Sequence, residues 1–215
     1  MPRDRRQPAA RRRSRRAARP SGDDRELAIL STLERLLEDR PFAEISVDDL
    51  ARGAGISRPT FYFYFPSKDA VLLTVFERVL AEADATFEGR ADDYTVDPAR
   101  AWRDGIYAFF EPLRRHLAVA LAGVAATATN AEIRELWSTF MQKWIGRTAA
   151  VITAERARGA APDTVPAQDL AAALSLMNER AMFASYSAQK PALDEAAALD
   201  TLVHIWVTSI YGQSH

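Results

Sequence analysis

The chain has 215 residues, 48% of them hydrophobic and 27% charged, which is enough for one large domain or two small ones with a real core. It contains no cysteine, which excludes a disulfide framework and a thiolate metal site, and it has no run of about 20 strongly apolar residues, which argues against a membrane span. The net charge of −1 hides an asymmetry, because residues 1–20 hold nine arginines and a single acid and so carry +8, against −9 for the remaining chain.

The basic segment 1–20 consists largely of Arg, Ala and Pro without periodicity, a composition typical of disorder. Such an arm can lie on DNA phosphates or reach into the minor groove, where each neutralised phosphate releases a counterion. A solvated tail and an Arg-rich organellar transit peptide are the alternatives. The transit-peptide interpretation lacks an apolar stripe, and residues 46–65 have the pattern of two short capped helices joined by a glycine turn, which is typical of DNA-binding proteins, so we favour an arm that contacts DNA.

The first predicted helix follows this arm. Its apolar side is built from leucines at helical spacing, and Arg40 followed by Pro41 ends it. The apolar residues are Leu27, Leu30, Leu33 and Leu37, accompanied by Ile29 and Leu36.

Two short helices joined by a tight turn come next, which is the pattern of a helix-turn-helix. Ser46 precedes an apolar run and is followed three residues later by Asp49, so the two side chains should cap a helix that begins directly after Ser46. Gly55 supplies the left-handed backbone conformation that a sharp turn needs. Ser57 caps the next helix, and Pro59 stands in its first turn, where the missing N–H costs nothing.

The second of these helices, from about Arg58 to Phe65, is rich in aromatic residues. Phe61 and Phe65 are four residues apart and share one side, so we expect them in the core. In a recognition helix the other side reaches base edges, while hydroxyl and ammonium groups hold phosphates. A helical hairpin with an aromatic core and no role in DNA binding is the alternative. The residues that we predict to contact DNA are Ser46, Ser57, Arg58, Pro59, Thr60, Tyr62, Phe63, Tyr64 and Lys68.

The pattern beyond Pro66 is helical almost throughout. A fourth helix from Lys68 to about Phe87 should link the DNA-reading part to the rest, and the polar stretch 89–98 should be a mobile loop. Further helices are expected at about 101–114, 117–127, 130–158, 167–188 and 195–211. The prediction is therefore an all-α chain of about nine helices, with a disordered arm at 1–20, a helix-turn-helix domain at 21–68 and a ligand-binding and dimerisation bundle at 69–215.

The run Gly-Ile-Ser-Arg-Pro-Thr-Phe-Tyr-Phe-Tyr-Phe-Pro-Ser-Lys at 55–68 resembles the recognition helix of the TetR family of bacterial one-component regulators. The segments 18–30, 135–145 and 199–212 resemble one branch in particular, which includes a mycobacterial repressor of a monooxygenase gene. The resemblance covers nearly everything after residue 18. It implies a TetR-like fold and a cytoplasmic repressor that binds a palindrome-like DNA operator as a homodimer. It also implies release by a small apolar effector and control of a neighbouring monooxygenase gene.

The body contains many large flat side chains and one polar side chain in an unusual place. Trp137, Met141 and Trp144 recur at helical spacing, and such a stripe is ordinarily core. Asn178, however, stands four residues from Leu174 on an apolar side, where a buried amide must either bridge helices or meet a ligand acceptor. Spacing alone favours plain core; the resemblance favours a tunnel for elongated apolar molecules.

The resemblance implies a set of residues that line this tunnel. Three of them depart from the relative's residue: Leu113 replaces Phe, Ser175 replaces Asn and Arg147 replaces Tyr. A guanidinium that faces an apolar tunnel needs a carboxylate such as Glu179, or else it points outward. The full predicted set is Trp102, Phe109, Leu113, Met141, Trp144, Arg147, Thr148, Ser175, Asn178, Glu179, Phe183 and Trp206.

The resemblance also implies a dimer through the last two helices. We expect the apolar side of the final helix to mark the seam, with Trp206 turned inward toward the protomer's own core. The residues on that side are Leu199, Leu202, Val203, Trp206 and Ile210.

Other classes of protein fit the sequence less well. The histidines His116, His204 and His215 have no metal-ligand spacing, and no Gly-rich phosphate loop is present, so we expect no metal, no cofactor and no enzyme activity. An architectural DNA-binding protein would not need so large a body. A TetR-like regulator of another gene or of an efflux system, with a different effector, remains the closer alternative.

Overall fold

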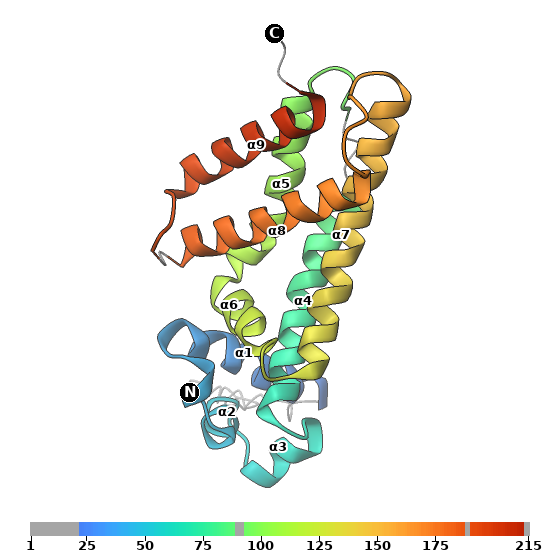
Figure 1. The fold of residues 1–215 in the computed structure, drawn as a ribbon. Helices are drawn as coiled ribbons and strands as arrows, with labels where there is room; N and C mark the ends of the chain where they lie inside the picture. The colour runs from blue at the N-terminus through green and yellow to red at the C-terminus, as the bar shows by residue number, and fades with distance from the viewer. Residues whose placement is uncertain (1–21, 89–92, 188–189, 213–215) are drawn as a thin grey trace, which may run out of the picture.

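The computed structural model describes residues 22–88, 93–187 and 190–212, and these are all-α (Figure 1). Within them lie nine α-helices, one 3₁₀ helix and no β-strand, which confirms the predicted fold class. The elements are α1 (Gly22–Asp39), η1 (Phe42–Glu44), α2 (Val47–Gly53), α3 (Arg58–Tyr64), α4 (Lys68–Glu88), α5 (Pro98–Arg115), α6 (Leu117–Ala126), α7 (Ala131–Ala157), α8 (Ala167–Tyr186) and α9 (Glu195–Tyr211).

The caps predicted for the helix-turn-helix are present. The Ser46 hydroxyl accepts from the Asp49 backbone N–H at 3.1 Å, and the Asp49 carboxylate accepts from the Ser46 backbone N–H at 3.0 Å, which is a complete capping box for α2. The Ser46 hydroxyl also donates to the Asp49 carboxylate at 2.6 Å, and this bond, together with that from the Ser46 backbone N–H, lowers the pKa of Asp49 to about 2. Gly55 has φ of 67°, so the turn uses the left-handed conformation, and Ser57 caps α3. Local chemistry therefore sets the bounds of both short helices.

The core of the head, which we define as α1–α3 with η1, follows from the apolar spacing in all but one place. Phe61 is fully buried and Phe65 is 7% exposed, as predicted, and they pack among Leu50 and the α1 residues. Leu27, by contrast, is 49% exposed, and Ile29 takes the buried place at the start of the apolar side of α1. The predicted stripe was wrong at that residue.

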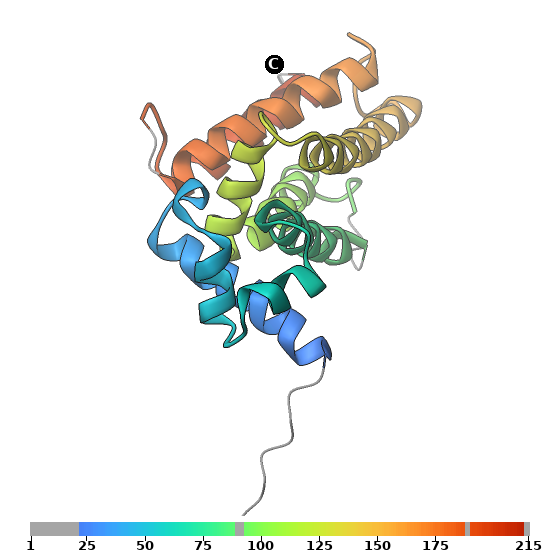
Figure 2. The same cartoon turned by 90° about the horizontal axis from the view of Figure 1, so that it is seen from below.

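Helix α4 connects the head to the body, which we define as α5–α9. It packs on α1 of the head and on α5, α6 and α7 of the body. Figure 1 shows it rising from the head beside α7, and Figure 2 shows the head helices on one side of the bundle with α8 along the opposite side. The body itself is held by α7 on α8, α5 on α9 and α8 on α9.

The segment before α5 differs from the prediction of a mobile loop. Residues 89–92 lie outside the described part of the chain, but the Asp93 carboxylate accepts from the Thr95 backbone N–H at 2.8 Å and from the Thr95 hydroxyl at 2.6 Å. The Tyr94 ring then packs on Trp102, with centroids 4.8 Å apart. Asp97 caps α5, which begins at Pro98 rather than at 101. This segment therefore forms a capped turn that belongs to the body.

Candidate DNA-reading surface and effector pocket

The short helix α3 presents two large aromatic side chains to solvent. Phe63 is 83% exposed and Tyr62 is 47% exposed, whereas Phe61 next to them is buried. Thr60 stands in the first turn, with its hydroxyl 2.8 Å from that of Ser57. Exposed rings on a short helix at one end of the molecule are costly unless they meet a partner surface. This arrangement suits a recognition helix.

Arg58 links the two helices of the motif. It donates to the Asp48 carboxylate at 3.0 Å and to the Tyr62 hydroxyl at 3.3 Å, and its guanidinium lies over the Tyr62 ring. The hydrogen bond to Tyr62, together with the charge of Asp48, raises the pKa of Arg58. Both partners of the ion pair are more than half exposed, so it holds the side chain only weakly against a competing anion.

Lys68, one of the residues predicted to contact DNA, connects α4 to η1 within the head. Its ammonium donates to the carbonyl oxygens of Phe42 at 2.9 Å, Ile45 at 2.8 Å and Ala43 at 3.4 Å, and it lies over the Phe42 ring. These three acceptors match its three N–H donors. A lysine at the first turn of α4 thus faces the carbonyl end of η1, and its contact with DNA stays a prediction. Tyr64 is half-buried against the core of the head.

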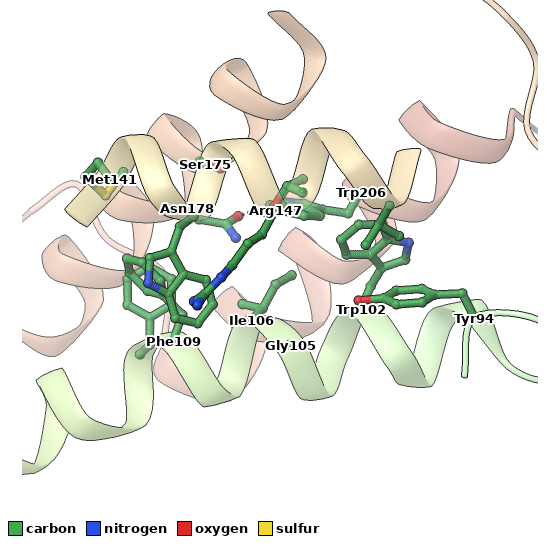
Figure 3. A pocket seen from close by; sticks show the side chains of 14 residues that line it. Tyr94, Trp102, Gly105, Ile106, Phe109, Met141, Arg147, Ser175, Asn178 and Trp206 are labelled. Atoms are coloured by element: carbon green, nitrogen blue, oxygen red, sulfur yellow. Dashed lines mark hydrogen bonds between the residues drawn. The ribbon is translucent and has the colours of Figure 1, made fainter. Parts of the chain in front are cut away.

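A pocket that is partly open to solvent lies within the body (Figure 3). It is walled by α5 and α7, with α8 and α9 completing it and Tyr94 at one end. Most of its walls are aromatic or aliphatic, with a few polar groups, which is typical of a small-molecule site. The lining residues are Tyr94, Trp102, Gly105, Ile106, Phe109, Phe110, Met141, Trp144, Arg147, Thr148, Val151, Ser175, Asn178 and Trp206.

Three predicted lining residues do not line this pocket. Leu113 is fully buried and belongs to the general core. The Phe183 ring packs against Phe110 and Trp137, with centroids 6.4 and 6.2 Å away. Glu179 is half-buried; burial raises its pKa, and a hydrogen bond with the Trp137 side chain opposes that rise. These positions were carried over from a resemblance, and they lie next to the residues that do line the pocket without reaching it.

The remaining predicted lining residues are in place, and five more join them. Ile106 lies four residues after Trp102 and Val151 three after Thr148, so helical spacing alone could have found both. Gly105 and Phe110 flank that stripe on α5. Tyr94 could not have been found in this way, because it comes from the turn before α5.

A buried hydrogen bond orients the amide of Asn178. The indole N–H of Trp206 donates to Asn178 Oδ1 at 2.8 Å, and both residues are 4% exposed. An indole nitrogen only donates, so the amide oxygen must face it and the amide NH₂ must point the other way. Figure 3 shows that nitrogen directed into the pocket. Asn178 therefore offers a donor to any molecule that occupies the pocket.

Arg147 lines the pocket and is also tied to α4. It donates to Asp84 Oδ1 at 3.1 Å, and its guanidinium lies 5.6 Å from the centre of the Trp144 ring. Lys143, one turn earlier on α7, donates to the other oxygen of Asp84 at 2.7 Å. The carboxylate that a guanidinium in this wall was expected to need is therefore supplied by Asp84 on α4, and not by Glu179, which had been named as one example.

A buried network closes the end of the pocket that lies farthest from the head. The Trp102 ring packs between those of Tyr94 and Trp206, and the Trp102 indole N–H donates to the Tyr211 hydroxyl at 3.3 Å. Tyr211 in turn donates to Glu155 at 2.8 Å. Glu155 is 4% exposed, and its pKa is lowered, above all by hydrogen bonds from Arg158. A paired buried carboxylate fixes these helices with respect to one another.

The predicted dimer face needs correction. Leu202, Val203 and Ile210 on α9 are buried in the protomer's own core, as is Trp206, whose inward direction was predicted, while Leu199 is half-buried. The outward sides of the last two helices carry other residues at helical spacing. They are Ala173, Leu176 and Arg180 on α8 and Ala197, Thr201 and His204 on α9.

The described part of the chain contains neither a metal-binding cluster nor a membrane-spanning helix. No group of three or more His, Asp or Glu side chains there is arranged to hold a metal ion. None of the helices in the ranges 22–88, 93–187 and 190–212 is long and apolar enough to cross a bilayer.

Two family models match the chain. Residues 29–75 match the model "Bacterial regulatory proteins, tetR family", and residues 102–212 match "Transcriptional regulator EthR, C-terminal domain". The chain is 65% identical over 203 residues to the HTH-type transcriptional regulator EthR of Mycobacterium tuberculosis, covering 94% of each chain. It is 58% identical over 200 residues to EthR of Mycolicibacterium smegmatis, covering 93% of this chain and 92% of that one.

Solved structures of more distant proteins share the fold. A putative regulator from Saccharomonospora viridis, in complex with choline, superposes with a TM-score of 0.67 at 23% identity, covering 85% of this chain and 95% of that one. A putative regulator from Pseudomonas aeruginosa gives 0.68 at 17% identity over 93% and 96%. The EthR relatives are transcriptional regulators and not enzymes. The chain therefore belongs to the TetR family of bacterial transcriptional regulators and is an EthR-like, DNA-binding member of it.

Proposed function

We propose that this protein is a ligand-responsive repressor, which binds a specific operator as a homodimer and leaves it when an apolar small molecule fills the pocket. It would act in the cytoplasm and, as the resemblance to EthR suggests, control a neighbouring monooxygenase gene. The single observation that carries the proposal is the position of α4, which has one end fixed to the head and the other tied to the pocket wall.

The fixed end is Lys68, whose ammonium is bonded to the carbonyl oxygens of η1. The tied end is Asp84, whose carboxylate accepts from Arg147 of the pocket. The helix rises by about 24 Å between these two residues, at 1.5 Å per residue. A helix of this length behaves as a rigid rod, so a displacement near Asp84 is passed to the head.

In a dimer, a displacement of α4 would change the spacing between the two DNA-reading heads. One short recognition helix reads few bases, so a second copy on an adjacent turn of the major groove is needed for a specific site. We place the seam on the outward sides of α8 and α9, where Leu176 is 56% exposed. A ligand releases DNA only if it prefers the conformation whose two heads are wrongly spaced, because equal affinity for both states shifts nothing.

The sites follow from this function. Thr60, Tyr62 and Phe63 would read bases, and Arg58 would move from Asp48 to a phosphate. The basic segment 1–20, which lies outside the described residues, would add phosphate contacts next to α1. In the pocket, the Asn178 amide would donate to a carbonyl of the ligand while the aromatic walls bury its apolar part, at roughly 25 cal/mol per Å² removed from water.

The experiment is a titration of one operator complex with uncharged apolar ligands that carry a carbonyl. The operator is found by selection from random duplexes or from the intergenic region next to the gene. We expect a concentration-dependent loss of the specific complex, with random DNA much less affected. If the ligand binds without any loss of operator affinity, the pocket does not control DNA binding. If the protein binds selected and random duplexes equally well, an architectural role is favoured.

A further inference from the structure

We propose that Arg147 selects effectors that carry a carboxylate head on an apolar tail, and that this carboxylate takes the place of Asp84 beside the guanidinium. The inference rests on the effector pocket of the proposed function and names the class of molecule that it takes.

The charge of the pocket wall favours an anion. Among the fourteen described residues that line the pocket, Arg147 is the only one with a formal charge. Its side chain is 23% exposed, so the guanidinium is largely within the wall, and Figure 3 shows it extending across the pocket in front of the aromatic side chains. A guanidinium presents a fork of N–H donors that matches a carboxylate in a two-bond geometry.

Asp84, which accepts from Arg147, would not be left as an uncompensated charge if Arg147 bound a ligand carboxylate instead. Asp84 accepts from Arg147 at 3.1 Å and from Lys143 at the shorter distance of 2.7 Å, through different oxygens. Removal of one partner from a buried ion pair is costly because the remaining charge is uncompensated. Here Lys143 would remain on Asp84 while Arg147 turns to the ligand, so that both carboxylates stay paired.

The rest of the pocket fits the other parts of such a molecule. Thr148, Ser175 and Asn178 line it and can donate to a second carboxylate oxygen. Next to Arg147 the wall is formed by Trp144 and Phe109, whose rings meet edge to face with centroids 4.6 Å apart. An apolar tail leads away from the charged head along these rings.

The exchange would also act on the DNA-binding state. A carboxylate that captures Arg147 removes the hydrogen bond between the pocket wall and α4, whereas an uncharged ligand of the same length leaves this bond in place. We therefore expect acids to release more operator at equal occupancy than their esters.

Decanoate and methyl decanoate form a matched pair of probes, because they share the tail and differ in head-group charge. Their dissociation constants are measured with the full-length protein and without DNA, by calorimetry or by tryptophan fluorescence. We expect decanoate to bind about tenfold more tightly, the scale of one hydrogen bond to a charged group. Arg147→Gln should abolish this preference by weakening decanoate alone.

Two further variants separate the exchange from general charge effects. Asp84→Asn removes the competing carboxylate and should strengthen decanoate binding while leaving methyl decanoate unchanged; this is a gain that a damaged fold would not produce. Arg100→Gln is the charge-matched control, since Arg100 is an exposed residue of α5 outside the pocket, and it should keep the wild-type preference.

The outcomes distinguish this inference from the proposed function. If both probes bind equally and release the operator, the carboxylate preference is refuted and the gated pocket stands. A preference for decanoate that survives Arg147→Gln would assign the head group to another residue and refute the role of Arg147. If neither probe binds, both the inference and the pocket of the proposed function fail.

Discussion

Trp206 donates its indole N–H to the amide oxygen of Asn178 at 2.8 Å, deep between α8 and α9. The bond does two things, since it satisfies a buried donor and turns the amide NH₂ toward the pocket. Asn178→Leu should weaken carbonyl ligands by about 1–3 kcal/mol, the usual cost of an unmade buried hydrogen bond. Operator affinity without ligand should stay nearly unchanged.

Asn178→Leu also leaves the buried Trp206 N–H without an acceptor, so the protein should lose stability. The double variant Asn178→Leu with Trp206→Phe removes both polar partners and should recover much of the lost thermal stability but none of the ligand affinity. Calorimetry and thermal unfolding of the wild type and the two variants check this. Recovery of ligand affinity in the double variant would contradict a direct contact between Asn178 and the ligand.

Phe63 and Thr60 should report on base reading. Phe63→Ala or Thr60→Ala should cost about 1–3 kcal/mol on the specific operator and less on random DNA. Because Phe63 is 83% exposed, its removal should leave the unfolding temperature nearly unchanged. Phe61→Ala is the contrasting variant: Phe61 is fully buried, so that change should unfold the head at a cost of about 3–5 kcal/mol. Equal losses on specific and random DNA would argue against base reading.

Deletion of residues 1–18 should change the salt dependence of DNA binding. These residues hold every arginine of the basic segment except Arg19, so their removal takes away phosphate contacts and not base contacts. The slope of log affinity against log salt should become shallower, by about 0.9 for each phosphate that the arm no longer neutralises. Fluorescence anisotropy over a range of salt concentrations measures it, and an unchanged slope would identify a bystander tail.

The dimer seam can be tested with a matched pair of apolar residues. Leu176→Glu places a charge on the outward side of α8 and should yield folded monomers with weak operator affinity, because the spacing of the two heads is lost. Val203→Glu places the same charge in the protomer's own core and should unfold the protein instead. Analytical ultracentrifugation and circular dichroism distinguish the two. A folded Leu176→Glu dimer would place the seam elsewhere.

The head was predictable because its signals are local. Ser46 with Asp49, Gly55 and Ser57 fix helix ends through hydrogen bonds and backbone conformation within a few residues. The contacts of Lys68 within the head could not be predicted, because its three acceptors lie 23 to 26 residues earlier in the chain. No pattern around Lys68 reveals that the carbonyl end of η1 faces it.

The helices of the body could be predicted from the sequence, but which side of each helix faces the core, the pocket or a partner could not always be. Helix α9 carries apolar residues on nearly all sides, so helical spacing could not choose between core and dimer seam for Leu202 and Val203. The pocket was found through the resemblance and not through spacing, and the misplaced Phe183 shows the limit of that route. Tyr94 needed the fold, because a turn brings it over Trp102.

The most direct test measures ligand occupancy and operator binding on the same sample. Tryptophan fluorescence reports occupancy, since Trp102, Trp144 and Trp206 line the pocket, and the anisotropy of a labelled operator reports release. We expect the operator to dissociate in step with occupancy, and operator DNA in turn to lower the affinity for the ligand by the same factor, as linkage requires. A ligand that saturates the pocket while operator affinity stays constant would contradict the proposed gating.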